Sequence, residues 1–101
     1  MAVKIHGEYQ EKKKVQVTHE PSGFTFHTAA PIDNNGDGSS FSPTDLVATA
    51  LGSCMLTLIT ITAEKNSIDI SKLSFEIEKH MIADPRRIGS LPITIFLQRN
   101  L

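Results

Sequence analysis

Apolar and polar residues alternate along three short segments at the start of the chain. The alternation runs over residues 3–9 and resumes at 15–18 after the polar turn at 11–14. It returns at 24–28 after the break at Pro21–Gly23. A period of two predicts half-buried strands. The short turns between these strands predict an antiparallel meander.

The next apolar segment has the signals of a long helix. Ser42 is suited to the N-cap and Pro43 to the first helical position. The stretch from Leu46 to Thr62 has almost no charge, and Glu64–Asn66 ends it in solvent. Such a helix is expected to be buried on most sides, with the small residues Ala48, Gly52 and Ser53 letting a second helix approach closely. The residues that recur at helical spacing are Leu46, Val47, Ala50, Leu51, Cys54, Met55, Leu58 and Ile59.

The remainder of the chain returns to strand patterns. Residues 73–81 alternate, with Leu73, Phe75 and Ile77 on one face, and residues 92–97 form a last apolar strand after a loop at 83–90. The predicted order is β-β-β-α-β-β. It corresponds to one α+β domain over residues 1–101, with an antiparallel sheet packed on a long central helix. A helix that is apolar all round and a sheet with one uncovered face also predict a partner subunit.

Composition excludes several classes of function. The net charge is −1, so we expect neither nucleic acid nor an anionic membrane surface as a partner. A single cysteine forbids an intramolecular disulfide. The N-terminus lacks the apolar region of a signal peptide, and four hydroxyl residues interrupt the apolar run from Leu46 to Ile61, which is expected to fall short of a membrane span. These features predict a cytoplasmic protein.

One segment resembles half of a calcium-binding loop. Asp33, Asn35, Asp37 and Gly38 match its first positions, but the twelfth position is Thr44, which cannot supply a bidentate carboxylate. A strand precedes the loop where a helix is needed, so a plain Asx/Gly turn is favoured.

The histidines give no metal-ligand spacing, and we expect neither a metal nor another cofactor. A Cys–His pair stays open, because such pairs meet only in the fold, but solvated strand histidines are favoured. The four are His6, His19, His27 and His80.

Cys54 and two nearby arginines are the remaining candidates for chemistry. Free cysteine is among the most buried residue types, so Cys54 taken alone is expected in the core. Its helix starts near Pro43, and the helix dipole fades before Cys54, so activation of the thiol needs a cation from elsewhere. Arg86 and Arg87 lie in a constrained loop between Pro85 and Gly89 and could supply it, although a surface loop is favoured. Lys12–Lys14 is expected to form a solvated hairpin turn.

The segment around Cys54 resembles a known family. Residues 41–54, FSPTDLVATALGSC, are similar to the helix signature of the OsmC/Ohr family of bacterial thiol peroxidases. Residues 84–91, DPRRIGSL, resemble a loop in one branch of OsmC-like proteins. The predicted element order matches the N-terminal two-thirds of the family, so the resemblance covers essentially the whole chain.

That resemblance implies an intertwined homodimer, with sheets wrapped around central helices and active sites at the subunit interface. It implies that the Cys54 thiolate attacks the O–O bond of a hydroperoxide, giving a sulfenic acid and an alcohol or water. A second cysteine then forms a disulfide, which a dithiol reductant reopens. The expected role is defence against oxidative stress.

Three departures from the family pattern shape the prediction. Where the family has a glutamate that holds an activating arginine, this chain has Thr44, with Asp45 next to it. The family takes that arginine from the N-terminal hairpin, which here offers lysines, so Arg86 or Arg87 is the expected substitute. The resolving cysteine of the family lies on a later helix, and the chain is expected to lack that C-terminal segment.

Two functions therefore stand as predictions. The first is a thiol-dependent peroxidase in which Cys54 is the nucleophile and a reducing thiol comes from another molecule. The alternative is a non-catalytic dimer that binds a small apolar ligand or has a structural role.

Overall fold

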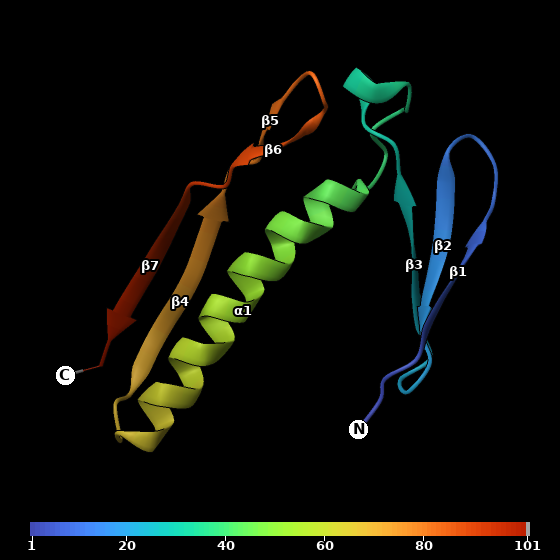
Figure 1. Ribbon diagram of the computed structural model, residues 1–101. Coiled ribbons are helices and arrows are strands. Elements are labelled where there is room, and N and C mark those ends of the chain that lie inside the picture. Colours follow the sequence, from blue (N-terminus) through green and yellow to red (C-terminus); the bar gives the residue numbers. More distant parts are fainter. Residues whose placement is uncertain (101) are drawn as a thin grey trace. The chain divides into compact units, whose positions relative to one another are not determined.

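The computed structural model describes residues 1–100. The chain divides into two compact units that meet at the start of its long helix, one over residues 1–43 and one from Thr44 onward. The first unit carries three strands. The second carries the helix and two strand pairs (Figure 1). The predicted α+β class with antiparallel strands is confirmed.

The first unit is an antiparallel meander in the order β1-β2-β3. The strands are β1 (Ile5–Tyr9), β2 (Lys14–His19) and β3 (Phe24–Ala29), close to the predicted ranges. Their register places Gly7, Val17 and Phe26 side by side on one face of the sheet.

The two faces of this meander differ in polarity. One face carries a hydrogen-bonded ladder of polar side chains, in which Gln10 donates to Gln16 (Nε2–Oε1 3.0 Å) and Gln16 donates to Thr25 (Nε2–Oγ1 3.2 Å). The other face is apolar, yet Ile5 and Phe24 on it remain more than half exposed. An exposed apolar sheet face of this kind marks a surface that another element or molecule covers.

The turn-rich segment after β3 is held by its own polar groups. It contains a short 3₁₀ helix, η1 (Ile32–Asn34). The backbone N–H of Ser39 donates to Asp37 (N–Oδ1 3.0 Å), and Lys14 pairs with the same carboxylate (Nζ–Oδ2 3.2 Å). Hydrogen bonds from the side chain and backbone of Ser39, followed by the Lys14 ammonium, lower the pKa of Asp37 to about 2. The Asx-turn interpretation of this segment agrees with these contacts.

The helix α1 (Pro43–Lys65) begins and ends at the residues that the sequence signals indicate. Pro43 is its first residue, and Ser42 just before it is almost completely buried. Beyond the helix, β4 (Ile70–Ile77) and β7 (Ile93–Arg99) form an antiparallel pair, in which Phe75 lies opposite Ile95.

The segment between β4 and β7 differs from the prediction. Residues 73–81 are not one strand, because β4 ends at Ile77 and a separate strand β5 (His80–Ile82) follows. The predicted loop at 83–90 contains β6 (Arg87–Ser90), which pairs with β5 as a small hairpin. Its turn contains a cis Asp84–Pro85 peptide bond. The strands β5 and β6 are too short, at three and four residues, to show a clear alternation, and the turn-forming residues between them favour a loop.

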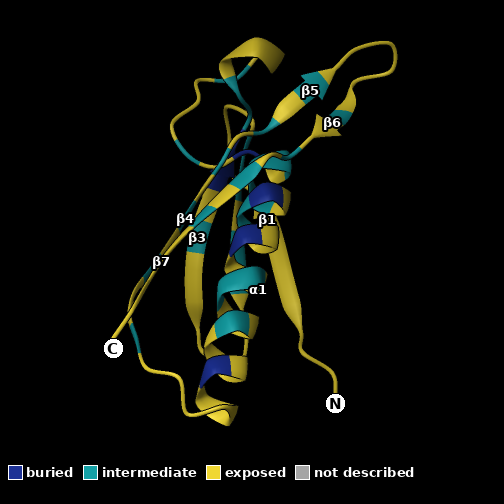
Figure 2. Cartoon of the chain, turned by 90° about the vertical axis from the view of Figure 1, so that its left-hand side faces the viewer, coloured by how far each residue is buried: buried dark blue, intermediate teal, exposed yellow. Residues whose placement is uncertain are grey.

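One face of α1 packs on the β4–β7 pair, and small helix residues allow the close approach. Ala48, Gly52 and Ala63 are the buried residues of α1 (Figure 2). A Cβ atom placed on Gly52 would lie 2.2 Å from the ring of Phe75. The small residues therefore accommodate the chain's own sheet, whereas the sequence pattern predicted a second helix against them.

The expectation that α1 is buried on most sides is wrong. Cys54 is exposed, and so are Val47, Leu51, Leu58 and Ile61 on the same side of the helix. The reason is that α1 is covered on one face, by the β4–β7 pair, and its apolar side chains continue around the opposite face. Figure 2 shows exposed and buried residues alternating along the helix.

By length and composition α1 could also cross a membrane. It has 23 residues, its most apolar 18-residue window has a mean hydropathy of 1.9, and only 17% of that window is buried. The prediction that the hydroxyl residues make this segment too polar to span a membrane is therefore wrong on length and composition. Thr49 and Thr57 donate to backbone carbonyl oxygens one turn earlier, to Asp45 and Ser53 (both 2.8 Å), which satisfies them inside the helix. A core helix of a globular protein has the same composition.

Candidate functional site

The candidate site is centred on Cys54, three turns into α1. Cys54 lies on the helix face opposite Gly52 and the β4–β7 pair, and its thiol is exposed. Its large apolar neighbours at spacings of three and four residues are Leu51 and Leu58, and Ala50 and Thr57 occupy the other two such positions. Val47 and Ile61 lie seven residues away from Cys54 in either direction. The four large apolar side chains are between 40% and 57% exposed. We call this row of residues, Val47, Leu51, Cys54, Leu58 and Ile61, the Cys54 stripe.

The stripe combines two chemical properties. An exposed thiol can meet a reactant, which a buried thiol cannot. The apolar side chains around the thiol gain free energy when an organic molecule or another apolar surface replaces the water in contact with them. The arrangement therefore suits a nucleophile that acts in apolar surroundings.

Thr44 and Asp45 lie in the first turn of α1, where both contact Lys79. The ammonium of Lys79 donates to Thr44 (Nζ–Oγ1 2.8 Å) and pairs with Asp45 (Nζ–Oδ1 2.8 Å). The side chain of Lys79 is only 15% exposed. A lysine from the segment between β4 and β5 therefore lies beside both Thr44 and Asp45. Lys79 falls inside the predicted strand at 73–81 and belongs to no motif, so no sequence signal marked it as a partner of Thr44 or Asp45.

Replacing Lys79 should weaken the attachment of β4 to the start of α1. Lys79→Met keeps most of the aliphatic stem and leaves the half-buried Asp45 carboxylate without this ammonium. A fully buried pair costs several kcal/mol to break, and the partial exposure of Asp45 reduces the expected loss to about 1–2 kcal/mol. Urea unfolding measures it, with Lys72→Met on the exposed part of β4 as the matched control. Equal effects of the two substitutions would contradict the structural role of Lys79.

Arg86 and Arg87 lie in the β5–β6 hairpin, away from Cys54. Figure 1 shows this hairpin beyond the N-terminal end of α1, whereas Cys54 follows Asp45 by nine residues, or roughly 13 Å of helix. The guanidinium of Arg87 donates to the carbonyl oxygens of Ala83 (3.2 Å) and Pro85 (2.8 Å). It therefore holds its own turn, and within one chain neither arginine is brought beside the thiol.

All four histidines are exposed, and three of them contact a nearby polar side chain. His6 contacts Glu20 (Nδ1–Oε2 3.0 Å), and His19 contacts Ser22 (Nδ1–Oγ 2.7 Å). His80, the histidine in the same unit as Cys54, pairs with Glu78 (3.3 Å). Across residues 1–100, no cluster of three or more histidine, cysteine or acidic side chains could hold a metal ion.

Comparison with known proteins places this geometry in a family. The sequence profile of the family described as "OsmC-like protein" matches residues 36–100, more than half of the chain. A search of curated proteins gave no match.

A solved structure also matches. The crystal structure of a proposed osmotic stress induced and detoxification response protein from Psychrobacter arcticus 273-4 superimposes with a TM-score of 0.89 at 43% sequence identity. The match covers 96% of this chain and 71% of the other. The matched profile includes α1 with Cys54, both strand pairs and Lys79. The chain therefore belongs to the family of OsmC-like proteins.

Proposed function

We propose that the protein is a thiol-dependent peroxidase that reduces hydroperoxides, with Cys54 as the nucleophile. One observation carries the proposal. The single cysteine lies in the middle of the profile-matched helix, and it is exposed among apolar side chains where sequence statistics alone favour burial. The detoxification response named for the Psychrobacter protein is compatible with this chemistry.

The reaction proceeds in balanced steps. The Cys54 thiolate sulfur bonds to the terminal oxygen of R–OOH, the O–O bond breaks, and its electron pair leaves with the alkoxide, which takes a proton to become the alcohol. The sulfur is oxidised by two electrons to a sulfenic acid. A thiol from another molecule then condenses with it, releasing water and forming a mixed disulfide. A second thiol attacks that disulfide and restores the Cys54 thiolate.

Cys54 is the only cysteine among these 101 residues, so the proposed reductant is a thiol of another molecule. A dithiol reductant suits both reduction steps, since its second sulfur attacks the mixed disulfide intramolecularly. The apolar surroundings of the thiol favour substrates with an organic group over hydrogen peroxide.

The Cys54 stripe is also the surface through which two copies associate in this proposal. Two stripes packed together bury the exposed side chains of Leu51 and Leu58 and narrow the access to the thiol. A cation from the second copy then approaches Cys54, a role for which Arg86 is the candidate. The protein is therefore expected to have a molar mass in solution of twice 11.1 kDa.

Replacing Arg86 with alanine should slow the alkylation of Cys54 at neutral pH, because the thiolate loses the cation proposed to stabilise it. Lys72→Ala, which removes a positive charge elsewhere, is the control and should leave the alkylation rate unchanged.

Turnover with a small dithiol tests the function. Purified protein mixed with tert-butyl hydroperoxide and dithiothreitol should produce one molecule of tert-butanol for each dithiothreitol oxidised, at a rate proportional to protein concentration. The rate with hydrogen peroxide should be lower. Alcohol formation no faster than in the protein-free mixture would refute the peroxidase proposal.

A further inference from the structure

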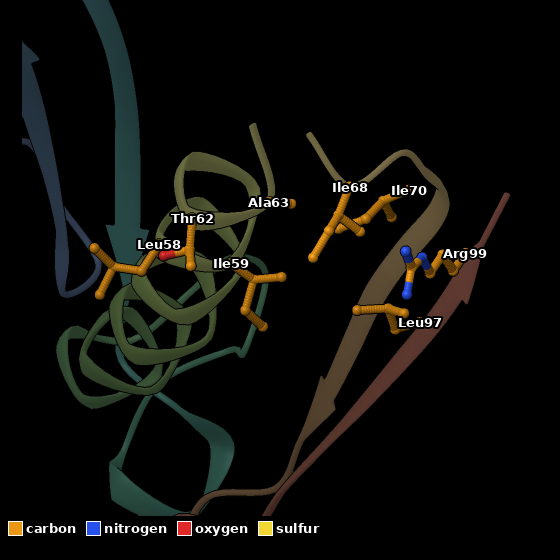
Figure 3. A pocket seen from close by; sticks show the side chains of 8 residues that line it. All are labelled: Leu58, Ile59, Thr62, Ala63, Ile68, Ile70, Leu97 and Arg99. Carbon is orange, nitrogen blue, oxygen red and sulfur yellow. The ribbon is translucent and has the colours of Figure 1, made fainter. Parts of the chain in front are cut away.

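A second apolar site lies toward the C-terminal end of α1, where it shares Leu58 with the Cys54 stripe but does not include Cys54. The C-terminal half of the helix, the segment after it and the end of β7 enclose a groove of about 470 Å³ (Figure 3). This volume is within the range of small-molecule sites. Its walls are aliphatic except for Thr62 and Arg99, and the lining residues are Leu58, Ile59, Thr62, Ala63, Ile68, Ile70, Leu97 and Arg99.

Arg99 gives this apolar groove a single charge. In Figure 3 its guanidinium extends from β7 to the same side as Leu97, over the space that Ile68 and Ile70 border. Within residues 1–100 it forms neither an ion pair nor a side-chain hydrogen bond. A guanidinium beside aliphatic walls is a ready partner for a carboxylate, which it can bind through two parallel hydrogen bonds.

Asp69, which lies just before β4, forms no ion pair with Arg99. Asp69 precedes Ile70, the cross-strand partner of Arg99, but its side chain accepts a hydrogen bond from Asn100 (Nδ2–Oδ2 3.0 Å). The backbone N–H of Asn100 donates to the carbonyl oxygen of Asp69 as well (2.9 Å). Asp69 and Glu64 line a smaller groove next to the first. An anionic headgroup is therefore repelled at that side and attracted at the Arg99 side, which fixes its orientation.

We infer that this groove binds the alkyl chain of an aliphatic monocarboxylate, with the carboxylate on Arg99 and the chain against Ile59, Ile68 and Leu97. The argument rests on charge complementarity. A neutral apolar molecule would form no ion pair with the Arg99 guanidinium, and a cationic ligand would be repelled by it. The site is independent of the Cys54 thiol, so it does not rest on the proposed peroxidase activity.

Octanoate is a suitable probe, with 1-octanol and octylammonium as ligands of equal chain length and different charge. Reduced protein carrying isoleucine methyl labels is titrated in NMR. Octanoate should shift Ile59, Ile68 and Ile70 saturably at about millimolar concentration. Arg99→Gln should weaken binding roughly tenfold, and Leu97→Glu should remove it. Lys72→Gln, which removes the same charge outside the groove, should leave binding unchanged.

Ile5 and Ile82 are internal controls because both are exposed apolar residues outside the groove and outside the Cys54 stripe. Equal shifts at these two residues would show nonspecific association and overturn the inference. Equal affinity for 1-octanol, or unchanged binding in Arg99→Gln, would overturn it too. Shifts of the groove isoleucines on dilution without ligand, with no octanoate binding, would show that a second copy occupies the groove instead.

Discussion

Cys54→Ser is expected to abolish hydroperoxide reduction, with alcohol formation falling by at least about 10³-fold to the uncatalysed rate. A serine hydroxyl has nearly the same size as the thiol, but it is not ionised near neutral pH and cannot form the sulfenic acid. Because Cys54 is exposed, the substitution should leave the unfolding midpoint almost unchanged. Loss of activity in a variant of unchanged stability would then result from the missing thiol and not from unfolding.

Ser53→Ala is the matched control, since Ser53 is the exposed residue next to Cys54 on the same helix. It should retain nearly full activity. A Cys54→Ser protein that still forms alcohol with dithiothreitol at the wild-type rate would show that the chain's one thiol is not the nucleophile.

Gly52→Ala is expected to destabilise the fold, although helix propensity alone predicts the opposite. Alanine stabilises a helix interior by up to about 1 kcal/mol relative to glycine. At this position its Cβ would lie 2.2 Å from Cε2 and 2.5 Å from Cδ2 of the Phe75 ring. Overpacking of this kind typically costs about 1–3 kcal/mol, so the net change in the free energy of unfolding should be unfavourable.

Two comparison variants make this prediction specific. Ser53→Ala changes the adjacent exposed residue and should be neutral or slightly stabilising. Phe75→Leu removes the ring, so adding Gly52→Ala to it should cost much less than in the native background. Urea unfolding of the wild type, the three single variants and the double variant measures both effects. A stabilised Gly52→Ala single variant would contradict the close packing of α1 on β4.

The sequence predicted the positions of the helix and strands better than it predicted which of their faces are covered. The bounds of α1 follow from Pro43 and from the charged residues near Lys65, because helix ends depend on local chemistry. The inward face of β4 follows from the alternation of Leu73, Phe75 and Ile77. These signals are local, and they persist whatever the rest of the chain does.

The helix faces could not be predicted in the same way. A helix with apolar residues on every side has no polar face to mark solvent, so periodicity cannot tell which side meets the sheet. The stripe that looked like core, including Cys54, is the exposed side. The covered side is made of small residues, because the Phe75 ring needs the space above Gly52.

The candidate site was predicted in part. The motif around Cys54 pointed to the right family. It did not point to Lys79, whose ammonium contacts Thr44 and Asp45 because the turn after β4 brings it there. The proposed roles of Arg86 and Arg87 depend on a second copy, and no pattern within one chain describes that contact.

The most direct test of the peroxidase proposal is to trap the sulfenic acid. Reduced protein is treated with one equivalent of an organic hydroperoxide in the presence of dimedone, digested and examined by mass spectrometry. The expected result is a single dimedone adduct on the peptide containing Cys54, formed only when hydroperoxide is added. An unmodified Cys54 that alkylates fully after denaturation would contradict the account.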